Sequence, residues 1–155
     1  MNMRDLIEKL KEQPKTVEEH REEQKKEWLG ALKKFFTEIE GWLTPAVTAG
    51  VLTTARAESE IVEQDFGDYR VPVLEIRSGG LTVRLDPVGV RVVGVVAAGG
   101  RRLLGLRGRV DLVCGPIRVP LVRDAAGTWK AVPMRGEPRD VTEESFSELL
   151  GEVLL

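Results

Sequence analysis

The spacing of apolar residues changes near residue 52, from the three- and four-residue steps of a helix to the alternation of a strand. After that point Leu81, Val83 and Leu85 alternate with polar neighbours, as half-buried antiparallel strands do. Before it, apolar side chains recur at the spacing of one helix face: Trp28, Leu29, Leu32, Phe35, Phe36, Ile39, Trp42 and Leu43. This order of patterns predicts an α+β fold, with helices first and a sheet after them.

The N-terminal third is predicted to form two helices. Residues 3–13 fit a short helix that Pro14 ends or interrupts. Thr16 stands three residues before Glu19, which is the signature of a capping box, and the helix that starts there is expected to run to Leu43. The apolar side of the first helix is formed by Leu6, Ile7 and Leu10.

Two further helical starts are indicated later in the chain. Thr44 and Pro45 suit the cap and first position of a short turn that Gly50 would stop. Asp140 stands three residues before Glu143, which predicts a C-terminal amphipathic helix. Its apolar face is formed by Phe146, Leu149, Leu150, Val153 and Leu154.

Glycine-rich turns divide the region between these helices into about seven strands. Glycines at 89, 94, 105 and 108 predict bulges or strong bending, as in a curled, mostly antiparallel sheet or a small barrel. We expect a helical segment over residues 1–50, which could protrude, and a sheet with the last helix over 51–155, all in one domain. The expected strands are 53–63, 70–77, 81–86, 89–97, 101–113, 116–122 and 128–134.

Residue types that carry familiar catalysis are scarce. The chain has one His and one Cys, which argues against most compact zinc sites and leaves no pair for a disulfide. His20 lies among charged residues on an expected exposed helix face, and Cys114 is expected to be a small buried side chain at a strand end. We therefore expect no catalytic residue, no metal site and no cofactor.

The net charge of −2 conceals a basic middle. Residues 84–139 hold 11 basic and 4 acidic side chains, whereas residues 140–155 hold 5 acidic side chains and no basic one. Such a patch could bind an acidic protein or a phosphate backbone, or it could be a solvated face neutralised by neighbouring carboxylates. Nucleic acid is the weaker option, because a surface that binds single-stranded nucleic acid also needs exposed aromatic side chains for base stacking. The expected sheet region offers only Trp129 for this role. The bases at polar positions of the expected strands are Arg84, Arg91, Arg109, Arg118 and Lys130.

The aromatic stripe of the long helix has two interpretations. It is core if the helix lies across the sheet, and it is a dimer or partner interface if the helix projects into solvent. The candidate interface residues are Trp28, Leu32, Phe35, Ile39 and Trp42.

Four short runs resemble a group of small, uncharacterised bacterial proteins. The similarity covers about residues 40–155 and implies a bacterial origin, and it carries no activity and no functional residue to this chain. The runs are Phe66-Gly67-Asp68-Tyr69-Arg70-Val71-Pro72, Leu85-Asp86-Pro87-Val88-Gly89, Gly108-Arg109-Val110-Asp111-Leu112 and Thr142-Glu143-Glu144-Ser145-Phe146.

The sequence thus predicts a non-enzymatic protein-interaction module of the bacterial cytoplasm, an accessory, adaptor or immunity-type subunit. Its partner would be another protein or a second copy of the chain, and no small-molecule substrate is inferred. The alternative is a module that binds anions or nucleic acid through the Arg-rich face, and an enzyme built on carboxylates and Arg is a third, weaker option. No apolar stretch is long enough to span a membrane, and the first residues lack a signal-peptide core.

Overall fold

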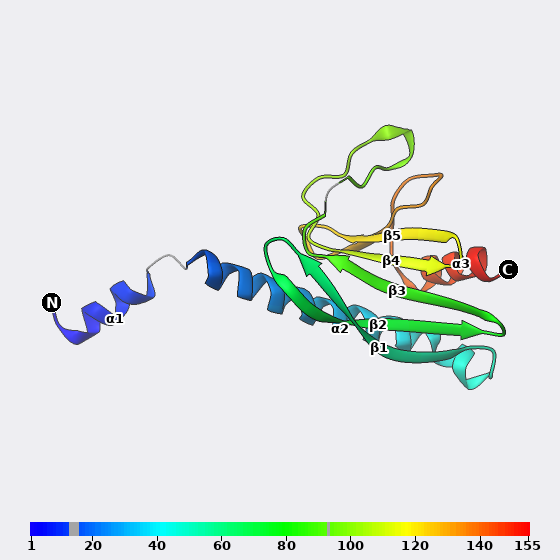
Figure 1. Ribbon diagram of the computed structural model, residues 1–155, viewed down its shortest axis with the longest axis horizontal. Helices are drawn as coiled ribbons and strands as arrows, with labels where there is room; N and C mark the ends of the chain where they lie inside the picture. The colour runs from blue at the N-terminus through cyan, green and yellow to red at the C-terminus, as the bar shows by residue number, and fades with distance from the viewer. Residues whose placement is uncertain (13–15, 93) are drawn as a thin grey trace.

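The computed structural model describes residues 1–12, 16–92 and 94–155. Within these residues the α+β prediction is confirmed, with two helices before a single sheet and one after it (Figure 1). The elements are α1 (Met3–Lys11), α2 (Val17–Thr48), β1 (Thr53–Glu63), β2 (Gly67–Ser78), β3 (Leu81–Gly89), the 3-10 turn η1 (Ala98–Gly100), β4 (Arg109–Cys114), β5 (Ile117–Arg123), β6 (Trp129–Ala131), β7 (Arg139–Asp140) and α3 (Glu143–Leu154).

The seven strands form an antiparallel meander in which each strand pairs with the next one along the chain. The sheet is not closed, so the curled-sheet form of the prediction is correct and the barrel form is not. Tight hairpins sit where glycine was expected to allow them. Gly79 and Gly115 have positive φ in the two-residue turns after Ser78 and Cys114.

Helices α2 and α3 cover one face of the sheet and share one hydrophobic core with it. Trp42 of α2 meets Phe146 of α3 at a ring-centroid distance of 6.0 Å, which joins the two helices. The buried residues that the sheet contributes to this core are Tyr69, Val71, Leu74, Ile76, Val83, Leu85, Val110, Leu112, Cys114, Val119, Leu121 and Ala131.

The helix boundaries differ from the sequence prediction in two places. Pro45 does not begin a new turn, because α2 continues through it to Thr48. Helix α3 is capped by Thr142 with Ser145 in a reciprocal capping box, and not by Asp140, which belongs to β7. The predicted cap at Thr16 is confirmed, since its hydroxyl accepts from the backbone N–H of Glu19 at 3.2 Å. The predicted break at Pro14 falls outside the described residues.

The predicted strand 89–97 is wrong, and the predicted strand 101–113 is mostly wrong, since only β4 forms there. The described part of residues 90–108 has one isolated bridge, between Val96 and Arg102, and the turn η1. Positive φ at Gly94, Gly99 and Gly105 explains the absence of a longer ladder, since such residues interrupt extended backbone. β7 was not predicted, and its two residues are too short to leave an alternating pattern.

The segment 90–108 covers part of the sheet face that the helices leave open. Val95 in this segment is buried with Val122 of β5 and with Val132, in a second small apolar cluster that Leu103 and Leu106 flank. Val92 and Val95 of the expected strand 89–97 are therefore part of a covering segment and not of a strand. Among the described helices, none is long and apolar enough to cross a bilayer.

Candidate functional site

Four of the five predicted basic residues lie on one face of the sheet. The register places Arg84 opposite Val113 and Val113 opposite Arg118, while Arg109 lies two residues from Asp111 on the same strand. Lys130 shares this face, because it pairs with Val122, which pairs with Arg109. Arg91 does not belong to the set, since it follows β3 in the segment 90–108.

Each base on this face has an acidic neighbour. The Nη1 of Arg84 lies 2.9 Å from Glu75 Oε1 and its Nη2 lies 3.0 Å from Asp86 Oδ1. Hydrogen bonding to Asp86 raises the pKa of the Arg84 guanidinium, although burial acts in the opposite direction. The Nζ of Lys130 is 3.8 Å from Asp140. The bases are thus largely neutralised, which favours the ion-paired interpretation over a site for phosphate.

Asp111 is the centre of this network. It is 2% exposed and accepts from Arg109 Nε and Arg118 Nη1, both at 2.7 Å. A buried carboxylate needs such partners, because an unpaired charge away from water is costly. We expect Asp111 to fix the two guanidinium groups in place on the sheet.

We predict that Asp111→Asn lowers the free energy of unfolding by about 1.5 kcal/mol. Both carboxylate oxygens accept from guanidinium groups, and the amide keeps one acceptor and turns an NH2 donor toward a guanidinium in place of the other, while water still reaches the partner arginines. Asp86→Asn is the matched control, since that side chain is 35% exposed and its loss should cost under about 0.5 kcal/mol. Urea denaturation measures both. Equal losses in the two variants would contradict a central role for Asp111.

The predicted helix interface is core in this fold. Trp28, Leu32 and Ile39 are fully buried, and Phe35 is stacked on Trp129 of β6 at a centroid distance of 4.1 Å. Trp42 is partly buried against Phe146. Four of the five side chains are buried under the sheet and Trp42 is partly covered by α3, so the stripe is core in this fold.

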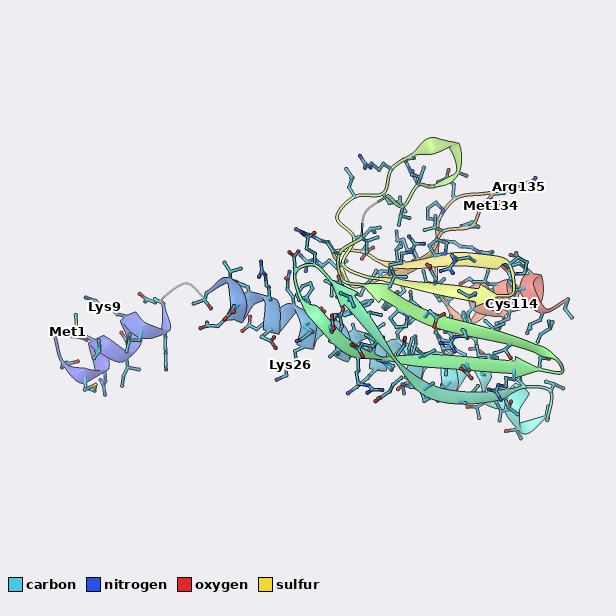
Figure 2. All side chains as sticks on the ribbon, in the orientation of Figure 1. Met1, Lys9, Lys26, Cys114, Met134 and Arg135 are labelled. Carbon is cyan, nitrogen blue, oxygen red and sulfur yellow. The ribbon has the colours of Figure 1, made fainter. Side chains whose placement is uncertain are left out.

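The Cys114 prediction is also correct. The side chain is buried at the end of β4, beside α3, and its thiol lies 3.8 Å from the carbonyl oxygen of Val153 (Figure 2). His20 is exposed on α2, as expected, but it borders a cleft that the sequence did not reveal.

This cleft has a volume of about 710 Å³ and is formed where three segments meet. One wall is the first half of α2, another is the turn between β1 and β2, and the third is the segment 90–108. Its lining mixes charged groups with an apolar patch made by Phe66, Val92 and Leu106. Two ion pairs bound it, one between Arg91 and Asp65 and one between Arg123 and Glu27.

The pair of Arg123 and Glu27 joins β5 to α2 across the floor of the cleft. Arg123 Nη1 and Nη2 donate to the two oxygens of Glu27 at 2.6 and 2.7 Å, and Nη2 also donates to the carbonyl of Arg107 at 3.2 Å. The guanidinium lies 5.8 Å from the ring centre of Trp28. Hydrogen bonding to Arg123 lowers the pKa of Glu27, so this carboxyl stays ionised in the folded protein.

Glu63 binds the start of the segment 90–108, which forms the third wall of the cleft. Its carboxylate accepts from the backbone N–H of Val90 at 3.0 Å and of Arg91 at 3.3 Å, and the hydroxyl of Tyr69 donates to it. Burial, with help from this bond, raises the pKa of Tyr69. A Cβ at Gly89 would lie 2.7 Å from the carboxyl carbon of Glu63, so a larger residue there would displace this carboxylate.

Sequence reasoning missed these cleft residues because their partners are far apart in the chain. Arg123 and Glu27 are separated by 96 positions. One signal was available: Arg123 follows Val119 and Leu121 at the inward positions of β5, where a charged residue needs a buried partner. The expected strand ended at residue 122, one residue too early to include it.

Helix α1 carries an apolar stripe that nothing in the described part of the chain covers. Met3, Leu6, Ile7 and Leu10 are 69%, 37%, 45% and 53% exposed, and no residue of α1 is buried. The helix stands away from the sheet, with Met1 and Lys9 far from the rest of the described chain (Figure 2). Asn2 caps it by accepting from the N–H of Asp5 at 2.8 Å.

The chain therefore presents an ion-paired basic face, a mixed cleft and an uncovered amphipathic helix. No protein-family model, no curated protein and no solved structure matches the chain. What it does has to be inferred from these three surfaces.

Proposed function

We propose that the chain is a protein-interaction module that inserts the apolar stripe of α1 into a groove on another protein. The observation that carries this proposal is the position of Met3, Leu6, Ile7 and Leu10, which follow the i, i+3, i+4, i+7 spacing of helices that dock in grooves. All four are exposed in the isolated chain.

The length of α1 supports the same proposal. A helix of nine residues is marginal in water on its own, because nucleation is costly and few hydrogen bonds repay it. Burial of the apolar stripe on a partner would add stabilising free energy that the isolated helix lacks, roughly 1.5–3 kcal/mol for each fully buried Leu or Ile. The helix is thus expected to be stable in a complex.

The polar face of α1 favours a protein over a lipid surface. Helices that lie on membranes are rich in Lys and Arg on that face. Here Arg4, Lys9 and Lys11 stand among three acidic residues, Asp5, Glu8 and Glu12, so the two signs are balanced.

We predict that Ile7→Glu with Leu10→Glu strongly weakens partner binding and leaves the fold intact, because no residue of α1 is buried. Removing two apolar anchors of about 1.5 kcal/mol or more each should weaken binding by about 100-fold. The measurement is affinity capture from the source organism with quantitative mass spectrometry, followed by titration calorimetry with the captured protein. The melting temperature of the variant should match that of the parent chain.

Lys9→Glu is the matched control, since it changes the net charge by the same amount on the polar face. It should keep the partner. The proposal fails if the control loses the same proteins as the double variant, if neither loses any, or if α1 binds lipid vesicles and captures no protein.

A further inference from the structure

The two edges of the sheet are very unequal. The strand β7 has two residues, whereas β1 has eleven and pairs along its whole length with β2, its single strand neighbour in the described part of the chain. No residue of β1 is buried, and residues 55–58 are exposed in succession on both faces. A long open edge offers a row of unpaired N–H and C=O groups to another strand.

We propose that this edge pairs with β1 of a second copy of the chain, antiparallel and centred on Ala57, so that two sheets become one. In such a pair, a two-fold axis perpendicular to the sheet places one residue opposite itself. Each possible register is therefore defined by the residue that lies on the axis. The charge pairs that each register creates along β1 show which one is favoured.

A centre at Ala57 places Arg56 of each copy opposite Glu58 of the other and two small side chains on the axis. Opposite charges facing each other across antiparallel strands are stabilising and like charges are destabilising. The neighbouring registers bring like charges together. A centre at Arg56 or at Glu58 would place that residue opposite its own copy, and a centre at Ser59 would place Glu58 opposite Glu60 twice.

The atoms needed for the two ion pairs have no bond within the described residues. Arg56 donates through Nε and Nη2 to Glu40 and Thr37 of α2, and no bond within the described residues uses its Nη1. Glu58 meets Arg70 Nε through Oε2 at 3.1 Å, and its Oε1 is likewise unused there. Because α2 already orders Arg56, little side-chain freedom is lost when the copies pair.

The interface would be narrow, so we expect a dissociation constant on the order of micromolar rather than nanomolar. The test is sedimentation velocity of the full chain from about 1 to 100 µM, a range that spans that value. Wild type should shift from monomer to dimer with concentration.

Ala57→Lys and Glu58→Arg should each weaken the dimer at least tenfold, because each places like charges opposite one another. Ala125→Lys, the same change as the first at an exposed turn residue, should leave it unchanged. Arg56→Glu and Glu58→Arg chains, each repelling its own kind, should pair when mixed. Arg56→Glu places a carboxylate against Glu40, so circular dichroism is used to check that this variant folds. The tests with Ala57→Lys and Glu58→Arg are valid whether or not Arg56→Glu folds.

A wild-type chain that stays monomeric at the highest concentration would overturn the proposal, as would a dimer that neither Ala57→Lys nor Glu58→Arg weakens. A dimer lost on Ile7→Glu with Leu10→Glu but kept in both β1 variants would assign self-association to α1. Binding of a foreign strand to β1 without a homodimer would also overturn it. None of these outcomes depends on the proposed function of α1.

Discussion

Gly108→Ala should lower the free energy of unfolding by about 3 kcal/mol, at the upper end of the cost of overpacking a core. A Cβ at Gly108 would lie 2.1 Å from Cζ3 of Trp28 and 2.8 Å from two more ring atoms. Trp28 is fully buried, and its ring centre lies 5.8 Å from the Arg123 guanidinium and 6.0 Å from the ring centre of Trp129. The ring therefore has little room to move, and the backbone of β4 or of α2 must shift instead.

Thermal melting measures this effect, with an expected fall in melting temperature of about 10 °C for a domain of this size. Gly30→Ala is the control, because nothing lies within 4 Å of a Cβ there and the residue is exposed in the middle of α2. That change should stabilise the chain by about 0.5–1 kcal/mol, since alanine loses less backbone entropy in a helix. Equal melting temperatures for Gly108→Ala and the parent would show that Trp28 is not wedged against β4.

Local sequence pattern was enough to predict some elements of this fold and not others. Periods of 3.6 and 2 reported which residues face a core, so the long helix, the hairpins at Gly79 and Gly115 and the last helix followed from local pattern. A continuous apolar run was misleading in the segment 90–108, where Val92 and Val95 cover the outer face of the sheet without a continuous ladder. Apolar character predicts burial, but it does not say whether a strand or a covering loop achieves it.

The candidate surfaces were less predictable for a related reason. Alternation placed Arg84, Arg109 and Arg118 on one face and offered neighbouring carboxylates as their partners. It could not show that the buried Asp111 accepts both from Arg109 of its own strand and from Arg118 of the next. The stripe of α2 has the same spacing whether a sheet or a partner covers it, and only the tertiary structure shows that it is core. The cleft needs contacts between residues near 27, 65, 91 and 123, which no local pattern encodes.

Glu27→Gln should remove about 2 kcal/mol of stability near pH 7, less than the loss of a partner from a fully buried pair because water reaches Glu27. Arg123, at 5% exposed, is left without its charged partner, whereas the Glu27 side chain is 62% exposed. The folded-state pKa of Glu27 lies below its ordinary value of 4.5 because Arg123 donates to it. Its contribution is therefore present above about pH 4.5 and lost as the pH falls through the folded-state value.

Denaturation near pH 7 and near pH 3 should show the difference in stability between the parent and Glu27→Gln becoming smaller in acid. Glu22→Gln, which breaks an exposed pair with Lys25, should change stability by under about 0.5 kcal/mol at both values. A gap between the parent and Glu27→Gln that stays constant with pH would mean that the charge of Glu27 does not hold β5 to α2, and that the floor of the cleft rests on the contacts of Arg123 with Trp28 and the Arg107 carbonyl.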